Sequence, residues 1–219
     1  MRALVTGGGR GIGKAIVAKF LERSIEVVAP GRQSLDLRDP VSIESFCSRF
    51  DGPLDVLVNN AGINEIALFG NLRDSQINDT LNVNLMGPIK LIRGLLQKLE
   101  ESPCGRIVNI SSVWSVVSKE GRSIYSISKS GLNALTRSLA TELSDKSILV
   151  NCVAPGFVDT ELTSKNNSQQ QLGAIKEQIP LKRLAEPGEI AELVYFLSSS
   201  SNTYITGQTI IIDGGFTCI

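Results

Sequence analysis

Short apolar runs alternate with longer amphipathic stretches from one end of the 219-residue sequence to the other. The longer stretches carry apolar residues three and four positions apart, as in Ile12, Ile16 and Phe20, which is the spacing of one helix face. Strands and helices that alternate throughout predict a parallel sheet covered on both faces, because parallel strands need crossover connections. The predicted strands are residues 3–6, 25–29, 54–59, 106–111, 148–154 and 209–213.

The sequence contains no internal repeat, no shift in composition and no linker rich in proline and glycine. A chain of this length can bury one large core. We therefore expect a single doubly wound α/β domain over residues 1–219. The one low-complexity stretch, SKNNSQQQ at residues 164–171, has no periodicity and predicts a mobile loop.

The net charge of zero and the absence of histidine limit the partners and the chemistry expected of the chain. The 22 basic and 22 acidic residues cancel, and no run of five like charges offers a track for phosphates, so a nucleic-acid partner is not expected. The sequence has no histidine, which excludes imidazole-dependent triads and histidine-containing metal sites. Acid/base chemistry must use Tyr, Lys, Asp, Glu or Cys, and we expect no metal site.

The four cysteines are scattered without a CxxC pair, which is typical of reduced thiols rather than of a disulfide framework. The apolar run near Met1 is too short for a signal peptide, and 18 apolar residues never occur in succession. These features predict a cytoplasmic protein without a membrane partner.

The first predicted strand runs directly into TGGGRGIG at residues 6–13, and helical spacing follows. Glycines allow a sharp turn and let backbone N–H groups approach a pyrophosphate, which the start of the next helix attracts. A glycine-rich turn alone is a weak signal, and a plain tight turn is the alternative. The strand before it and the helix after it favour dinucleotide binding.

The second predicted strand ends in APGRQS, without the Asp or Glu that usually accepts hydrogen bonds from the ribose of NAD. Arg32 follows this strand, and Arg10 lies in the glycine-rich turn. Two guanidinium groups could clamp a 2′-phosphate, which predicts NADP and leaves NAD possible. The alternative is that both arginines are ordinary solvated side chains.

Tyr125 and Lys129 are four residues apart in a stretch with helical spacing, so both side chains lie on one helix face. A nearby ammonium group, together with an oxidised nicotinamide, would lower the pKa of the phenol toward neutrality. Such a pair is otherwise a packed aromatic ring beside a lysine that extends to solvent. Ser112, at the end of a predicted strand, favours the catalytic interpretation, because ligands bind at that edge of open parallel sheets.

Thr6 with Gly7, Gly11 and Gly13 resembles the glycine motif of the short-chain dehydrogenase/reductase family. Further motifs follow in the family's order over nearly the whole chain: NNAG at 59–62, NVNLMG at 82–87, NISS at 109–112, YSISK at 125–129, PGFVDT at 155–160 and ITGQTIIIDGG at 205–215. The pattern is most similar to 3-oxoacyl-[acyl-carrier-protein] reductases, and it also resembles sugar and polyol dehydrogenases of the family.

The resemblance implies a Rossmann-like fold and NADP(H)-dependent hydride transfer between the nicotinamide and a carbonyl or alcohol. The expected substrate is a 3-oxoacyl thioester, with a sugar, a polyol or another small alcohol as the alternative. An NADP-binding sensor or scaffold is a further alternative, since some members of the family have lost catalytic residues. The presence of all four expected catalytic residues favours an enzyme.

The resemblance also implies residue roles. Tyr125 would donate the proton, Ser112 would hydrogen-bond the carbonyl oxygen, Lys129 would hold the ribose and tune Tyr125, and Asn84 would anchor a water molecule. The implied cofactor-binding residues are Gly7, Gly9, Arg10, Gly11, Ile12, Gly13, Arg32, Asp36, Leu37, Asn60, Ala61, Gly62, Tyr125, Lys129, Pro155, Gly156, Val158 and Thr160. The implied substrate-binding residues are Ser112, Trp114, Tyr125 and Phe157, although Trp114 could equally belong to the core.

Arg32 and Asp36 are only four residues apart, where family members usually insert a helix and a further strand. The sheet should therefore be shortened between its second and third strands, which leaves the adenine side of the cofactor more open. By the same resemblance, residues 161–187 carry a substrate lid, and the helical stretches 75–100 and 123–144 join copies of the chain into a dimer or tetramer. Candidates for docking a carrier protein, which could instead be solvated charges, are Lys119, Arg122, Lys146, Lys182 and Arg183.

Overall fold

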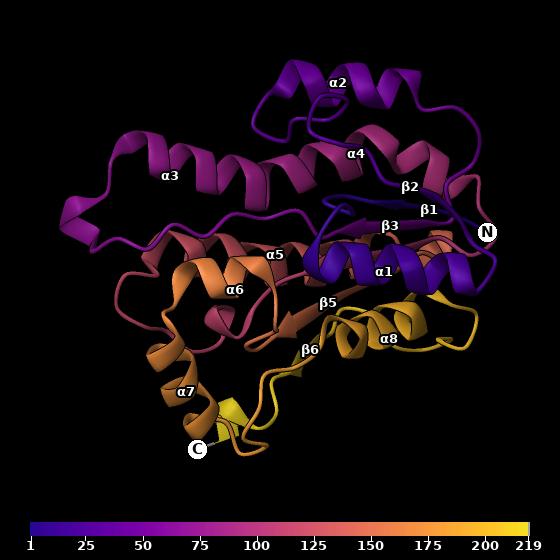
Figure 1. Ribbon diagram of the computed structural model, residues 1–219. Coiled ribbons are helices and arrows are strands. Elements are labelled where there is room, and N and C mark those ends of the chain that lie inside the picture. Colours follow the sequence, from indigo (N-terminus) through magenta and orange to yellow (C-terminus); the bar gives the residue numbers. More distant parts are fainter. Residues whose placement is uncertain (219) are drawn as a thin grey trace.

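Helices cover both faces of a six-stranded parallel sheet in the computed structural model, which describes residues 1–218 (Figure 1). The strand order is β2-β1-β3-β4-β5-β6, and every neighbouring pair is parallel. This arrangement confirms the predicted α/β architecture, and the strand ends differ from the predicted ones by one or two residues. The strands are β1 (Arg2–Val5), β2 (Glu26–Val28), β3 (Val56–Asn59), β4 (Arg106–Ile110), β5 (Leu149–Pro155) and β6 (Thr209–Ile212).

The helices form two layers. On one face α4 and α5 lie against the sheet, with α2 outside α4, and on the other face α1 packs beside α8 (Figure 1). The α-helices are α1 (Gly11–Glu22), α2 (Pro40–Arg49), α3 (Asp74–Leu81), α4 (Gly87–Glu100), α5 (Ser123–Glu142), α6 (Glu161–Asn166), α7 (Gln169–Gln178) and α8 (Pro187–Ser198). A π-helical turn (Asn82–Met86) joins α3 to α4, and short 3₁₀ turns occur at Phe69–Asn71, Val113–Ser115, Ser144–Lys146 and Phe216–Cys218.

An apolar ladder crosses the sheet and fixes its register. Leu4 pairs with Leu57, Leu57 with Ile107, and Ile107 with Val150, and all four side chains are fully buried against the layer that contains α4. The alternate strand residues point to the opposite face and form a second core with α1 and α8. Burial on both faces explains why these strands are continuously apolar in sequence.

The connection between β2 and α2 is short, as expected from the sequence. Residues 29–39 lead from β2 to α2 without a further helix or strand, so β2 is an edge of the described sheet. Leu35 and Leu37 are buried in the core beneath α2 and α4 and anchor this connection. The shortening therefore removes sheet on the side of the predicted adenine site without disturbing the core.

The prediction of a loop at residues 164–171 is wrong, because α6 ends and α7 begins within this stretch. Ser168 and Gln171 form a capping box: the Gln171 amide N–H donates to Ser168 Oγ at 3.3 Å, and the Ser168 N–H donates to Gln171 Oε1 at 2.7 Å. Leu172, Ile175 and Ile179 then bury the apolar face of α7. The apolar residues that stabilise the helix follow the polar run and are not part of it.

None of the described helices is both long enough and apolar enough to cross a lipid bilayer. Within residues 1–218, no three Cys, Asp or Glu side chains gather in a group that could hold a metal ion.

The apolar ladder predicts a strong dependence of stability on α4. Leu95 is fully buried between α4 and the sheet, whereas Leu21 on α1 is 57% exposed. We expect Leu95→Ala to lower the free energy of unfolding by about 2–5 kcal/mol, because it removes apolar contacts and leaves a cavity. The matched control Leu21→Ala should change it by less than about 0.5 kcal/mol. Urea denaturation checks both values, and equal losses in the two variants would contradict this description of the core.

Candidate active site

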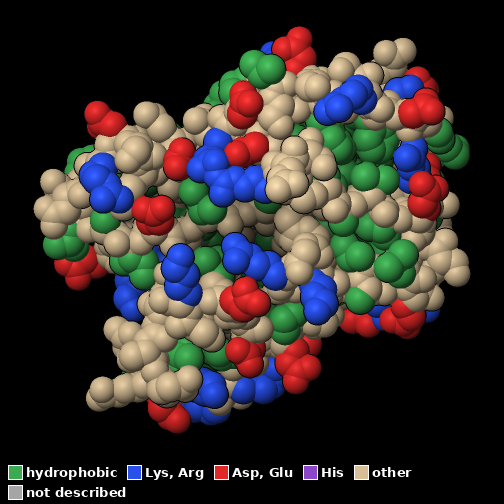
Figure 2. All heavy atoms as spheres, turned by 45° about the horizontal axis from the view of Figure 1, so that its top comes forward, with side chains coloured by type: hydrophobic (Ala, Val, Ile, Leu, Met, Phe, Trp, Pro, Cys, Tyr) green, Lys and Arg blue, Asp and Glu red, His purple; other side chains and the backbone are tan. Residues whose placement is uncertain are grey.

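A cavity of about 780 Å³ opens at the carboxyl edge of the sheet, where β1, β3, β4 and β5 end. This is the edge at which open parallel sheets bind ligands. All of the residues implied for cofactor and substrate line the cavity, and of the expected catalytic residues only Asn84 lies outside its lining. Figure 2 shows a hollow bordered by Lys and Arg side chains interspersed with acidic ones.

The turn after β1 forms one wall of the cavity. Thr6 Oγ1 accepts hydrogen bonds at 3.0 Å from the backbone N–H groups of Asn60 and Ala61, which ties this turn to the end of β3. Gly7 has φ +66°, and a Cβ at Gly13 would lie only 2.2 Å from the Gly7 carbonyl oxygen. A side chain at Gly13 is therefore incompatible with this turn.

The start of α1 faces the same cavity. Arg10 occupies the N-cap position but gives no side-chain cap, so the first N–H groups of the helix are available to a ligand. Uncapped N–H groups at a glycine-rich helix start suit a pyrophosphate. The residues present thus fit the phosphate part of a dinucleotide.

Three arginines line the cavity: Arg32 and Arg38 in the segment after β2, and Arg10 at the start of α1. Arg32 Nε donates to Asp36 at 3.2 Å, Arg38 Nη2 donates to the same carboxylate at 2.9 Å, and Arg10 lies 3.7 Å from Glu161. Asp36 thus holds Arg32 and Arg38 together at the cavity wall. Arg38 was not among the predicted residues, although its position two residues after Asp36 is a signal for it.

Tyr125 and Lys129 lie on the first turns of α5, and Ser112 follows β4. Lys129 is 3% exposed, its Nζ donates to the Ile110 carbonyl oxygen at 2.7 Å, and it lies 5.7 Å from the centre of the Tyr125 ring. The three residues lie in one cavity and leave room beside them for a reacting carbonyl group.

Burial is the main influence on the pKa values of Lys129 and Tyr125. It lowers the pKa of Lys129 to about 8. It also raises the pKa of Tyr125, while the Ser112 hydroxyl and the charge of Arg122 act in the opposite direction. The sequence-based expectation was that Lys129 would lower the phenol pKa. Without a bound nicotinamide the burial of the phenol outweighs its neighbours, so Tyr125 is protonated at neutral pH.

Asn84 is fully buried in the π-helical turn. Its amide accepts a hydrogen bond from the Ile63 N–H at 2.9 Å and donates to the Ile63 carbonyl at 2.8 Å, which fixes the segment after β3. A Cβ at Gly62 would lie 3.4 Å from Asn84 Oδ1 and 3.5 Å from Lys129 Nζ, so both polar groups approach the same glycine. The water relay through Asn84 stays a prediction.

Trp114 has both of the roles that the sequence left open, since it lines the cavity and also packs in the core. It lines the cavity, and it is also 8% exposed and packs edge-on against Phe157 and Phe216, with ring centres 5.9 and 6.0 Å away. These three rings form an aromatic wall between the cavity and the base of α7.

The positive charge of Arg122 suggests a docking surface for a carrier protein, but the structure shows that Arg122 does not belong to such a surface. The residue is 7% exposed and lines the cavity, and its guanidinium carbon lies 5.9 Å from the centre of the Trp114 ring. Lys119 and Lys146 are exposed, while Lys182 and Arg183 form ion pairs with Glu177 and Glu189. Packing against Trp114 removes Arg122 from the surface, and no local sequence signal indicates that packing.

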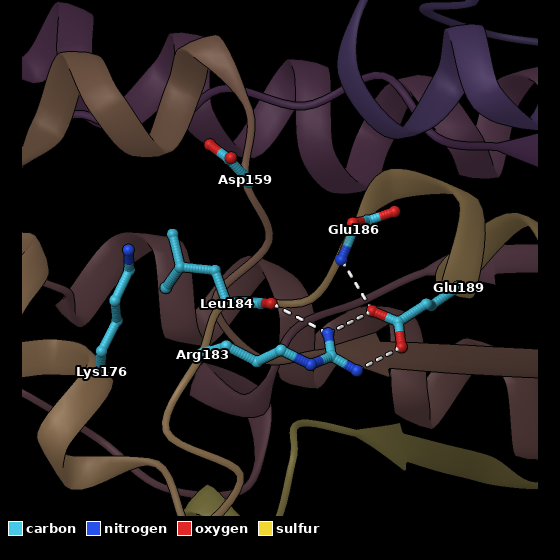
Figure 3. Close-up of a pocket in the computed structure, with 6 residues that line it drawn as sticks. All are labelled: Asp159, Lys176, Arg183, Leu184, Glu186 and Glu189. Atoms are coloured by element: carbon cyan, nitrogen blue, oxygen red, sulfur yellow. Dashed lines mark hydrogen bonds and ion pairs between the residues drawn. The ribbon is translucent and has the colours of Figure 1, made fainter.

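A second cavity of about 450 Å³ lies between α7 and the start of α8 (Figure 3). Arg183 donates to both carboxylate oxygens of Glu189 at 2.7 Å and to the Leu184 carbonyl at 3.1 Å. Of the charged residues that line this cavity, Arg183 and Glu189 pair with each other, and the lining contains neither Tyr125 nor Lys129.

Comparisons with known proteins agree with this geometry. The sequence pattern of a family described as Enoyl-(Acyl carrier protein) reductase matches residues 34–217. The 3-oxoacyl-[acyl-carrier-protein] reductase FabG of Salmonella typhimurium is 36% identical, over 97% of this chain and 96% of that protein.

Solved structures are similar over nearly their whole length. The Pseudomonas aeruginosa RhlG/NADP active-site complex superposes with a TM-score of 0.92 at 32% identity and covers 98% of this chain and 95% of that one. A 4-hydroxyisoleucine dehydrogenase complexed with NADH superposes with a TM-score of 0.94 at 30% identity and covers 100% and 99%.

The buried ammonium group of Lys129 predicts a pH-dependent stability. Burial lowers its pKa from 10.5 to about 8, which corresponds to roughly 3 kcal/mol against folding while both states are protonated. This cost is fully present below pH 8 and is relieved as pH rises from 8 toward 10.5, because the folded protein loses the proton first.

The comparison of wild type with Lys129→Met isolates this effect. In urea denaturation between pH 7 and 10, the unfolding free energy of the wild type should rise relative to that of Lys129→Met, with the change beginning near pH 8. A constant difference across this range would contradict the lowered pKa.

Proposed function

Because the chain belongs to the short-chain dehydrogenase/reductase family, we propose that it is an NADPH-dependent reductase of 3-oxoacyl thioesters, such as those carried by acyl carrier protein. The observation that carries this proposal is the convergence of Ser112, Tyr125 and Lys129 beside the glycine-rich turn in one cavity. The name of the relatives supports the acyl-thioester substrate.

The proposed cofactor site follows the cavity. The pyrophosphate lies on the turn from Gly7 to Gly13, the adenosine end contacts Asp36, Leu37 and residues 60–62, and Arg10 and Arg32 bind the 2′-phosphate. Pro155, Gly156, Val158 and Thr160 surround the nicotinamide side. The uncapped start of α1 and the position of Arg32 beside Asp36 in the cavity lining support this order.

When bound, NADPH supplies the hydride to the carbonyl carbon. Tyr125 donates its phenolic proton to the carbonyl oxygen, which Ser112 holds by a hydrogen bond, and the product is an alcohol. The phenol carries its proton at neutral pH, as the proton donor of a reduction must. Lys129 binds the nicotinamide ribose and returns a proton to Tyr125, and Asn84 anchors the water molecule that connects Lys129 with solvent.

The substrate enters beside the aromatic residues Trp114 and Phe157, and the segment 161–187 covers it. Helices α6 and α7 make up much of this segment, and Leu162 and Asn166 of α6 line the cavity. A lid of this kind excludes water from the reacting groups.

We further propose that residues 1–219 form one domain and that the protein acts in the cytoplasm as a homo-oligomer, either a dimer or a tetramer. Exposed apolar side chains support the association. They include Met86 between α3 and α4, Ile127 on α5 and Ile211 on β6, each at least 39% exposed. Light scattering distinguishes the two assemblies.

Removal of the phenolic hydroxyl tests the catalytic assignment. We expect Tyr125→Phe to lower turnover of a 3-oxoacyl thioester by roughly 10²-fold or more, with NADPH affinity nearly unchanged, because the variant lacks only the proton donor. Tyr204→Phe is the matched control, since Tyr204 is 94% exposed. Turnover is measured by the loss of NADPH absorbance. Near-normal rates in Tyr125→Phe would refute the assignment, and tight NADPH binding by a wild type that reduces no carbonyl substrate would indicate a sensor.

Arg32 tests the cofactor preference. We expect Arg32→Gln to weaken NADPH binding by roughly tenfold, since one charge-assisted hydrogen bond to a phosphate is lost, and to leave NADH binding nearly unchanged. The exposed Arg49 provides the control Arg49→Gln. Fluorescence titration gives both affinities. Equal weakening of NADPH and NADH would place the 2′-phosphate elsewhere.

A further inference from the structure

Arg122 carries a buried positive charge that no acidic side chain of the described residues balances. The residue is 7% exposed, its Nη1 atom is buried without a hydrogen-bond partner, and burial lowers its pKa. The contact with the Trp114 ring, at 5.9 Å, gives partial compensation. A buried guanidinium keeps its charge and needs an acceptor, and within residues 1–218 no side-chain hydrogen bond supplies one to Arg122.

The other cations of the cavity are already partnered. Arg10 pairs with Glu161, Arg32 and Arg38 share Asp36, and Lys129 donates to the Ile110 carbonyl oxygen. Among the cations of the described lining, Arg122 therefore differs in having a buried nitrogen without a hydrogen-bond partner.

The backbone around Arg122 is fixed next to the reacting groups. Its N–H donates to the Lys119 carbonyl at 3.2 Å, and its carbonyl accepts from the Ser126 N–H at 2.8 Å. Arg122 precedes the first residue of α5, and its charge acts on the phenol of Tyr125, so the two side chains are near each other. The Trp114 N–H donates to Ser112 Oγ at 3.3 Å, so Ser112 and Arg122 both adjoin Trp114.

We propose that Arg122 binds the C1 oxygen of the substrate and thereby selects compounds with two carbonyl groups in a 1,3 relation. This inference rests on the proposed function and specifies its substrate class. In a 3-oxoacyl unit, the C3 oxygen lies on Ser112 and Tyr125, and the C1 oxygen two carbons away accepts from the Arg122 guanidinium, which lines the same cavity. The same donor suits a thioester carbonyl or the carboxylate of a free 3-oxo acid.

Steady-state kinetics with three substrates tests this subsite. The substrates are an acetoacetyl thioester of N-acetylcysteamine, acetoacetate, and 2-pentanone, which lacks the C1 oxygen. We expect Arg122→Met to lower kcat/KM for the thioester by roughly 10- to 100-fold, mainly through KM, and to leave the value for 2-pentanone nearly unchanged. Arg122→Lys should restore part of the loss, and Arg49→Met is the matched control. If the simple ketone reacts too slowly, the dissociation constants of the corresponding alcohols with the NADP⁺-bound enzyme are compared.

Thermal unfolding separates binding from a structural role. Arg122→Met should melt at the same temperature as the wild type or higher, because it removes an unsatisfied buried charge and keeps an apolar stem on Trp114. Equal losses of activity on the thioester and the ketone, or no loss on the thioester, would overturn the inference.

The outcomes for the wild type distinguish this inference from the proposed function. If the wild type reduces acetoacetate in an Arg122-dependent way but no thioester, the C1 subsite stands and the thioester assignment fails. If it reduces the thioester and Arg122→Met does so equally well, the proposed function stands and the subsite fails. If it reduces neither 3-oxo compound, both fail.

Discussion

The apolar ladder through Leu4, Leu57, Ile107 and Val150 is the constraint on which the rest of the structure depends. Each rung is buried, and the alternate residues of the same strands fill the second core, so a shift of one residue would disturb close packing on both faces of the sheet. The carboxyl ends of these strands therefore meet along one line, where β1 leads into the glycine-rich turn and β4 into Ser112. The cavity is therefore a consequence of strand register, because core packing fixes the strand ends and the strand ends position the loops that line the cavity.

Burial also determines the chemistry in a chain without histidine. The low exposure of Lys129 lowers its pKa, and the same environment keeps the Tyr125 phenol protonated. A third polar group, the Arg122 guanidinium, is held there without an acidic partner. Each of these groups costs folding free energy, which the large apolar core offsets. The site thus combines three residues that a protein optimised only for stability would not bury together.

Most of the fold could be predicted from local pattern, and the parts that could not depend on contacts between distant residues. Strand and helix periodicity located the sheet, and the spacing of Tyr125 and Lys129 predicted their shared helix face. The helix at residues 169–178 was missed because its apolar face begins after the polar run, although Ser168 and Gln171 form a recognisable capping box. Arg122 was predicted to contribute to a docking surface because of its positive charge, with an ordinary solvated charge as the alternative. Its burial depends on Trp114, eight residues earlier, and on the packing of Trp114 with Phe157 and Phe216.

The central claim is that one cavity brings a dinucleotide and the Tyr125–Lys129 pair together at the carboxyl edge of the sheet. A crystal structure of the protein with NADP⁺ tests it most directly. We expect the pyrophosphate on the turn from Gly7 to Gly13, the 2′-phosphate beside Arg32, and the nicotinamide ring within contact distance of Tyr125. A nucleotide bound outside this cavity, or one with its adenine end beside Tyr125, would contradict the account.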